Sequence, residues 1–442
     1  MKKKEVKKCP AMDNLNESKK KELEKYVKDY MLFLDKARTP RMTVDEMINM
    51  VTSKGFVEYS SEIKYMPGFY LTNENHSCIA LVKLGKKSIE EGIRIVGAHT
   101  DSPCLHLKPH PLKECPLGVR LDSQPYGGIN SWEWFDRLVR VVGVVIKNGK
   151  EIVIDFEGTI MDPAPHLVGK DVMDKKVKDA FDKEDLDILT GYRSKGELLK
   201  KLGIEEKDFG RAELYVVPIE KTRRIGELIV GYGQDDRVCA YTATQGLLEA
   251  DPEYTSIVIG IDKEEIGSTG ETGAEGIFLE QVIDKVIAIQ TGRALSQITT
   301  PYIRNILSKS RMISADVIFS ANFRNITAGV VDEDNVAKAG YGFTIGIYNG
   351  SGNKYDGNQV SANYADELMG LFDKAGVVYQ TEGIPSKVGH GGGGTIAKFF
   401  SARGIRTADG GVPLSGMHSK TEITHISDVY QTIKAFKTFL EV

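Results

Sequence analysis

The chain has 442 residues, of which 41% are hydrophobic and 27% are charged, and its formal net charge is −4. This balance is typical of a globular protein, and a slightly acidic chain has no general attraction to nucleic acid or to anionic membranes. No apolar run approaches the ~20 residues of a membrane-spanning helix, and the Lys-rich first residues lack the apolar core of a secretory signal. The length exceeds one ordinary core, so we expect two domains.

The first predicted elements are two helices. The first is amphipathic, with these apolar residues on one face: Leu23, Tyr26, Val27, Tyr30, Met31 and Leu34. The second is expected to begin at Thr43, because Glu46 follows three residues later in a capping-box pattern.

Short apolar runs then alternate with helical stretches. Strands are expected at residues 93–97, leading to His99, and at 256–261, 286–289 and 312–313, with a helix around 246–249. This alternation predicts an α/β fold in which a β-sheet is flanked by helices.

The middle of the chain has a different composition. It contains β-rich pieces at 139–146, 152–156 and 214–217, and a charged, less hydrophobic stretch at 169–210. We interpret residues 104–220 as a β-rich domain inserted into a sheet domain made of residues 1–103 and 221–442.

Cysteine usage points to a reducing compartment. The five cysteines are odd in number and widely spaced, which is typical of neither a disulfide framework nor a zinc knuckle: Cys9, Cys78, Cys104, Cys115 and Cys239. We therefore expect a cytoplasmic protein, and we expect histidines and carboxylates to hold any metal.

Five short segments combine a metal-capable side chain with a strand end or a tight turn. They are residues 97–103 (GAHTDSP), 234–237 (QDDR), 262–268 (DKEEIGS), 313–316 (ISAD) and 416–419 (GMHS). In an open α/β sheet, ligands bind at the carboxyl ends of the strands, so residues that are distant in sequence can meet there.

Two-metal hydrolysis of a peptide bond needs these residue types. One carboxylate bridges two divalent cations about 3.5–4 Å apart, and each cation takes its own histidine and carboxylate, ligands that suit zinc. A further carboxylate accepts the proton of the attacking water. Glu264 and Glu265 can divide these roles, because neighbouring side chains at a strand end point in different directions. Asp101 can fix the tautomer of His99 from two residues away.

Each segment alone also has an ordinary structural explanation. His99 fits a satisfied structural histidine, residues 235–237 fit a salt-bridged surface turn, and residues 264–265 fit a solvated pair. The glutamate pair, however, follows a wholly apolar strand, and charged side chains at such a position are unfavourable unless they have a function. The occurrence of all five segments in one chain favours the functional interpretation.

The ordered set of motifs resembles the aspartyl aminopeptidase family of metallopeptidases. The resemblance also includes Tyr-Gly-Gly at 126–128, Phe-Asp-Arg at 135–137 and Gly-Gly-Thr-Ile-Ala at 393–397, and it extends from about residue 20 to the end. It implies a metallopeptidase domain with a mixed β-sheet flanked by helices, an inserted β-rich dimerisation domain, and dimers that assemble into a tetrahedral dodecamer. The implied activity is removal of the N-terminal residue, acidic or broader, from peptide substrates.

The resemblance also implies a role for each matched residue. The implied ligands are His99, Asp235 and Asp316 for one cation, and Asp235, Glu265 and His418 for the other. Asp235, and not Asp236, would be the bridging carboxylate, Glu264 the general base, and Asp101 the residue that orients His99. The two cations would be zinc, with cobalt or manganese as alternatives.

Two departures from the acid-specific members bear on substrate preference. Those members carry a histidine-containing segment after the residue that matches Asp316, whereas residues 317–322 contain no histidine. Their inserted domain also supplies a histidine to a neighbouring subunit's site, for which His166 is the candidate here and Lys170 an alternative at the matching position.

Two further residues are candidates for substrate contact. Lys354 could pair with an acidic substrate side chain, or it could be an ordinary surface lysine. Gly392 belongs to the glycine-rich run 389–394, which would lie close to substrate or metal because glycine permits close backbone approach. A phosphate-binding loop is excluded, because the Lys-Ser/Thr pair that it requires does not follow the glycines.

Two other functions remain as alternatives. One is a two-metal deacylase or amidohydrolase acting on N-acyl amino acids, and the other is a scaffold that has lost catalysis. The segment at 126–128 favours the peptidase over the deacylase, and the complete ligand set argues against a silent scaffold.

Overall fold

The structure is a computed structural model that describes residues 9–60, 68–162, 169–176, 180–181, 183–321, 329, 334–348, 358–383 and 394–442. The chain divides into two compact units. The first comprises Met1–Asp101, Thr222–Met417 and Glu422–Val442, and the second comprises Ser102–Lys221 and His418–Thr421. Among the described residues, no helix has both the length and the apolar character that a membrane span requires.

The first unit is built on a nine-stranded mixed sheet. The strand order is β1-β2-β3-β13-β4-β14-β18-β16-β17. In that order the strands are Val57–Glu58, Gly68–Thr72, Ile79–Lys83, Ser256–Ile261, Arg94–His99, Arg311–Ser314, Arg406–Gly411, Phe343–Gly346 and Tyr379–Glu382. The central strands β13, β4, β14 and β18 run parallel, so their carboxyl ends meet at one edge. The predicted mixed sheet is confirmed.

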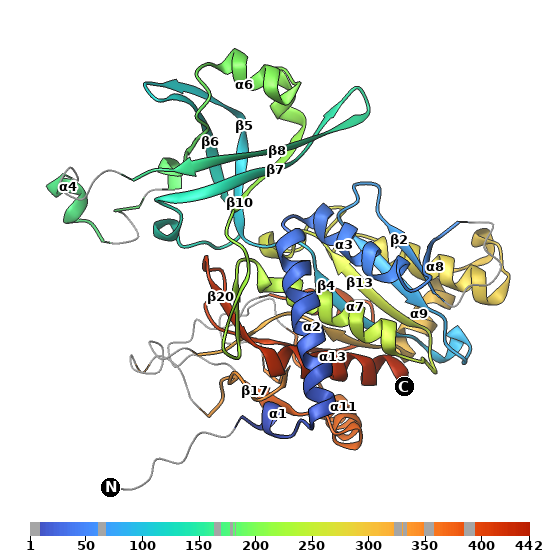
Figure 1. Cartoon of the computed structure of the whole chain (residues 1–442). Coiled ribbons are helices and arrows are strands. Elements are labelled where there is room, and N and C mark those ends of the chain that lie inside the picture. Colours follow the sequence, from blue (N-terminus) through green and yellow to red (C-terminus); the bar gives the residue numbers. More distant parts are fainter. Residues whose placement is uncertain are drawn as a thin grey trace, which may run out of the picture. The chain divides into compact units, whose positions relative to one another are not determined.

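Helices cover both faces of this sheet (Figure 1). On one face, an apolar cluster joins the sheet to α2 (Glu17–Lys36), α3 (Pro40–Thr52), α7 (Gln234–Glu249), α11 (Ala362–Ala375) and α13 (Ile426–Glu441). On the other face, a second cluster includes α8 (Phe278–Thr291), α9 (Thr300–Lys309) and α12 (Ala397–Ala402). Ile95 and Val96, successive residues of β4, point into different clusters, as a strand buried on both faces requires.

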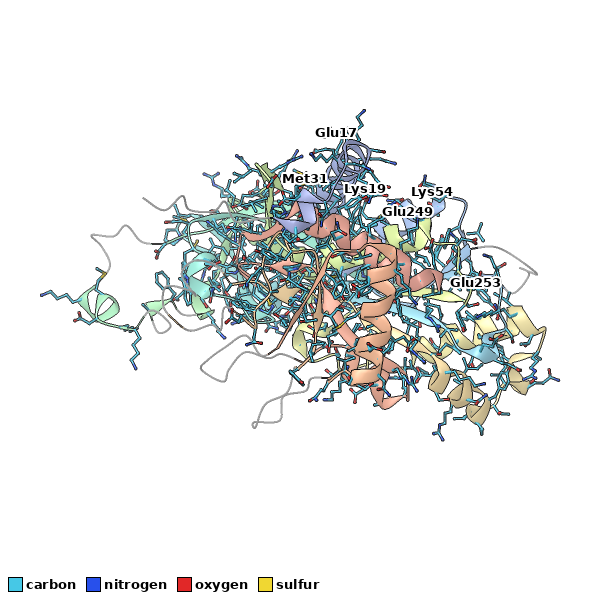
Figure 2. All side chains as sticks on the ribbon, turned by 90° about the horizontal axis from the view of Figure 1, so that it is seen from below. Glu17, Lys19, Met31, Lys54, Glu249 and Glu253 are labelled. Carbon is cyan, nitrogen blue, oxygen red and sulfur yellow. The ribbon has the colours of Figure 1, made fainter. Side chains whose placement is uncertain are left out.

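The two helices predicted first in the chain correspond to α2 and α3. The apolar face predicted for α2 is confirmed, and Figure 2 shows Glu17 and Lys19 at its exposed start. The predicted start of α3 at Thr43 is wrong, because the helix begins at Pro40. Thr39 caps it by accepting the Met42 N–H, and proline at the first helical position needs no hydrogen-bond acceptor.

The strand predictions are confirmed for β4, β13 and β14 and wrong for residues 286–289. Those four apolar residues lie inside α8, where Val286 and Ile287 continue a buried stripe that includes Val282 and Ile283. A short apolar run fits a buried helix as well as a buried strand, so it does not distinguish the two.

Two small sheets complete the first unit. A three-stranded antiparallel sheet consists of β11 (Arg223–Ile225), β12 (Leu228–Gly231) and β20 (Glu422–His425), and β12 leads directly into α7. A two-stranded sheet pairs β15 (Ile318–Phe319) with β19 (Pro413–Leu414).

The second unit contains a closed antiparallel barrel. Its strand order is β10-β5-β6-β9-β8-β7. In that order the strands are Ala212–Pro218, Cys104–Cys115, Gly118–Tyr126, Ile188–Leu189, Lys150–Ile160 and Arg137–Lys147. Among the described residues the barrel closes where β7 pairs with β10. The charged stretch at 169–210 includes the short helices α4 (Lys170–Met173) and α6 (Lys195–Leu202). The predicted role of this unit in dimerisation stays a prediction.

Candidate metal centre

The imidazole of His99 is fixed at the carboxyl end of β4. The residue is 2% exposed, and its Nδ1 lies 3.0 Å from the backbone oxygen of Asp101 and 3.3 Å from Asp101 Oδ1. Both neighbouring atoms are acceptors, so they favour a proton on Nδ1. That arrangement turns Nε2, the other ring nitrogen, toward the carboxylates described next, as a ligand histidine requires.

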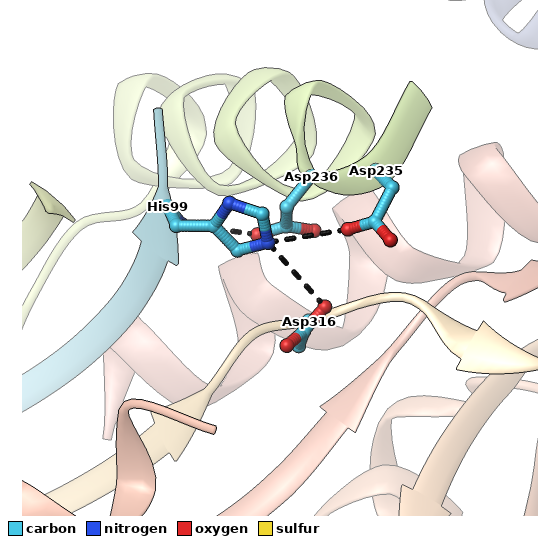
Figure 3. A group of neighbouring side chains, drawn as sticks. All are labelled: His99, Asp235, Asp236 and Asp316. Carbon is cyan, nitrogen blue, oxygen red and sulfur yellow. Dashed lines mark hydrogen bonds and ion pairs between the residues drawn. The ribbon is translucent and has the colours of Figure 1, made fainter. Parts of the chain in front are cut away.

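Three aspartates surround Nε2 of His99. Figure 3 shows Asp235 and Asp236 at the start of α7 and Asp316 in the segment after β14, with their carboxylates gathered beside the imidazole of His99. Nε2 lies 3.2 Å from Asp235 Oδ1 and 3.7 Å from Asp316 Oδ1. One ligand atom from each of the four residues lies within 4.8 Å of the others. Elements far apart in sequence therefore bring together one nitrogen donor and three carboxylates.

The two adjacent aspartates have different surroundings. Asp236 is completely buried, and its Oδ2 accepts the backbone N–H of His99 at 3.2 Å, which ties the end of β4 to the start of α7. Asp235 instead directs Oδ1 at the ring nitrogen of His99. The peptide bond between the two aspartates is cis.

Glu264 and Glu265 lie in a short 3-10 turn after β13. Their backbone N–H groups donate to the two oxygens of Asp101, each at 3.1 Å. Ligand atoms of His99, Glu264 and Glu265 also lie within 4.8 Å of one another. Asp101 therefore contacts both the imidazole and the glutamate turn, whereas the sequence suggested only the first contact.

The pKa values of these groups reflect a buried excess of negative charge. Burial and the nearby carboxylates of Asp316, Asp101 and Asp235, opposed by His99, together raise the pKa of Glu264 to about 8. Burial likewise raises the pKa of Asp316. Burial alone would lower the pKa of His99, but the surrounding carboxylates outweigh it and hold that pKa well above its usual range.

The donor set fits a divalent cation. A positive ion among these carboxylates would offset their mutual repulsion and favour their charged forms. One imidazole nitrogen with several carboxylate oxygens is a ligand set that zinc accepts.

One residue at this site was not predicted from the sequence. Glu422 is buried at the start of β20, and its Oε2 accepts the backbone N–H groups of Gln234 and Asp235. No local pattern in the sequence marks Glu422, and only the structure shows that it opens a short strand whose other residues are all partly or fully buried. A lone glutamate in such a strand usually needs a partner for its charge.

His418 belongs to the second unit, where it lies next to the Tyr-Gly-Gly segment. A Cβ at Gly128 would lie 3.2 Å from His418 Nδ1, so the absence of a side chain there lets the ring approach the backbone. The backbone of His418 has a φ of +62°, and two residues later the N–H of Lys420 donates to Glu133 at 2.9 Å. The predicted role of His418 as a metal ligand stays a prediction.

The three residues predicted to contact substrate lie outside the described residues: Lys354, His166 and Gly392. Their contacts stay predictions. Lys170, the alternative to the histidine, is described, and it is exposed at the first position of α4 in the second unit.

Comparison with known proteins relates the whole chain to one family. The family model described as aminopeptidase I zinc metalloprotease (M18) matches residues 33–440. The probable M18 family aminopeptidase 1 of Thermotoga maritima is 35% identical over 452 residues, covering 96% of this chain and 97% of the relative. Its counterpart from Borreliella afzelii is 34% identical over 456 residues, covering 96% and 98%.

Solved structures agree with this relationship. The crystal structure of an M18 aminopeptidase from Thermotoga maritima matches with a TM-score of 0.88 at 34% identity, covering 98% of each chain. The mApe1 dodecamer of S. cerevisiae shares the fold, with a TM-score of 0.75 at 21% identity, covering 93% of this chain and 95% of that one.

Proposed function

Because the chain belongs to the aminopeptidase I zinc metalloprotease family (M18) and is an aminopeptidase, we propose that it removes N-terminal residues from peptides with two bound divalent cations. The observation that carries the proposal is the convergence of His99 and three aspartates at the carboxyl edge of the parallel strands. The proposed ligands are His99, Asp235 and Asp316 for one cation and Asp235, Glu265 and His418 for the other. Zinc is the proposed metal, with cobalt and manganese as alternatives.

The described side chains suit distinct steps of hydrolysis. Divalent cations bound there would lower the pKa of a water and polarise the scissile carbonyl. Glu264 would accept the proton of the attacking water and return it to the leaving amine. Burial raises the pKa of Glu264, so its carboxyl can hold the proton between the two steps. Asp101 would keep both His99 and the glutamate turn in place.

The proposal also concerns which N-terminal residues the protein removes, and a substrate profile tests this. We propose acidic or broader specificity, because residues 317–322 lack the histidine of acid-specific members. The test is hydrolysis of aminoacyl reporters carrying each N-terminal residue, compared with N-acyl amino acids, at a defined zinc concentration. Cleavage of N-acyl amino acids alone would replace the aminopeptidase assignment with that of a deacylase.

Removing the metal should abolish hydrolysis and destabilise the first unit. Dialysis against a chelator leaves the buried carboxylates without a counter-ion, so we expect a lower thermal midpoint as well as lost turnover. At a zinc concentration 100 times the dissociation constant, the folded state gains about 2.7 kcal/mol. Activity assays and thermal unfolding, before and after zinc is restored, measure both effects. Full turnover in protein whose metal content is verified as zero would refute the metal-dependent mechanism.

We propose that the chain assembles from dimers into a tetrahedral dodecamer in the cytoplasm. The S. cerevisiae relative, which has been solved as a dodecamer, supports the assembly. None of the five cysteines, all of which lie in the described part of the chain, forms a disulfide, which suits a reducing compartment. Light scattering during size-exclusion chromatography should show a particle of twelve 48.8-kDa chains. A mass of one or two chains at micromolar concentration would contradict this assembly.

A further inference from the structure

Glu422 is a buried carboxylate that holds the backbone of the proposed bridging aspartate. The residue is 1% exposed, and its Oε2 accepts the N–H of Gln234 at 2.6 Å and the N–H of Asp235 at 3.2 Å. Glu422 and Asp235 are 187 residues apart in the sequence. One oxygen therefore fixes two successive peptide groups beside the metal centre.

The start of α7 depends on an acceptor from elsewhere. Asp235 and Asp236 have non-helical backbone angles, and Gly233, which precedes the helix, has no side chain that could cap it. The first N–H groups of a helix have no acceptor within the helix itself. A carboxylate at this end is also favoured by the positive end of the helix dipole. Glu422 supplies this acceptor from β20.

The strand that carries Glu422 is itself held firmly. β20 pairs with β12, with Glu422 opposite Gly231, three residues before α7 begins. The Gln234 side chain reinforces this pairing, because its Nε2 donates to the backbone oxygen of Glu422 at 2.7 Å. Its Oε1 accepts from Thr424 at 2.7 Å and from Tyr30 at 3.0 Å. The acceptor oxygen of Glu422 thus has little freedom to move relative to Asp235.

We propose that Glu422 is a positioning residue of the metal centre, which sets the direction of the Asp235 carboxylate through its backbone. The inference rests on the proposed function, because it takes Asp235 as a metal ligand. Ligand distances in metal sites tolerate about 0.2 Å of error, and loss of a supporting contact lowers metal affinity by about 10- to 100-fold. In this role the length of the Glu422 side chain matters most, because it brings the acceptor oxygen to the two N–H groups. The charge of the carboxylate is secondary.

Two substitutions separate reach from charge. Glu422→Gln keeps a carbonyl oxygen at the same distance and removes the charge, so we expect metal affinity close to that of the wild type. Glu422→Asp keeps the charge but withdraws the acceptor by about 1.5 Å, so we expect an affinity about 10- to 100-fold lower. The readouts are bound zinc per chain after dialysis against buffered zinc, and the visible absorption of a Co²⁺ titration.

Asp428 provides a matched control for general destabilisation. It is a completely buried carboxylate of the first unit, and it accepts two backbone N–H groups, from Gly340 and Gly342, at 2.7 Å each. Asp428→Leu should lower the midpoint of urea unfolding of the metal-free protein and leave metal affinity unchanged. Equal loss of affinity in this variant and in Glu422→Asp would overturn the proposal, as would wild-type affinity in Glu422→Asp. If the wild type itself binds no divalent metal, the proposed function fails instead.

Discussion

Replacing Glu264 with glutamine should lower peptide turnover by about 10²- to 10⁴-fold, the usual contribution of general acid–base catalysis, while bound metal per chain stays unchanged. Glutamine keeps the size of the side chain and cannot accept the proton of the attacking water. The backbone N–H of residue 264 should still donate to Asp101 Oδ1, so the turn after β13 keeps its position. We expect the loss in kcat, with little change in KM.

The pH profile gives this prediction a second measurement. Hydrolysis by the wild type should fall as pH drops through the pKa of Glu264, because the protonated carboxyl cannot act as a base. Burial raises that pKa to about 8 in the metal-free chain, and bound cations would lower it by favouring the carboxylate. The residual activity of Glu264→Gln should not show the fall at low pH that this carboxylate causes in the pH profile of the wild type.

A nearby glutamate offers the control. Glu271 is exposed and accepts a hydrogen bond from Asn75 at 3.0 Å, so Glu271→Gln should leave both turnover and metal content unchanged. Near-normal turnover in Glu264→Gln would remove Glu264 from the mechanism. Loss of metal from that variant would make Glu264 a ligand, and the base would then have to be sought elsewhere.

The fold could be predicted wherever a pattern was long or had a distinctive boundary. Strands β4 and β13 are each six residues long and buried throughout, with apolar runs at 95–98 and 257–261, and the sequence indicated both. The error at 286–289 arose because four apolar residues satisfy the pattern of a buried strand. The longer stripe that begins with Phe278 and Leu279 has helical spacing, and it accounts for the observed α8.

The candidate site could be predicted only in part, for a related reason. His99 ends β4, and Glu264 and Asp316 closely follow β13 and β14, which run parallel to β4. Their positions in the sequence therefore already indicated a shared edge. The support by Glu422 depends on the pairing of β20 with β12, which no local pattern around either strand encodes. The side chain of Gln234 makes three hydrogen bonds to residues of β12 and β20, so for the same reason the sequence showed it only as part of a motif.

Asp235→Asn should remove both cations, whereas Asp236→Asn should retain them. An amide carries no charge and is a poorer zinc ligand than a carboxylate, and loss of a bridging ligand weakens both sites at once. Asp236 already uses Oδ2 to accept the N–H of His99, and an asparagine oxygen can accept the same hydrogen bond. Burial raises the pKa of Asp236 well above its usual range, so the site disfavours its charge and should tolerate the amide.

The number of zinc ions bound per chain decides between the two aspartates. It is measured by elemental mass spectrometry on samples of each variant that are verified to be folded. Both have a ligand atom close to His99, so proximity alone leaves either one able to bridge. Retention of zinc in Asp235→Asn and its loss from Asp236→Asn would transfer the bridge to Asp236. Loss of a single equivalent from each variant would make each aspartate a ligand of one cation. The Asp236 carboxylate would then have to bind metal with only one oxygen, because the other holds the end of β4.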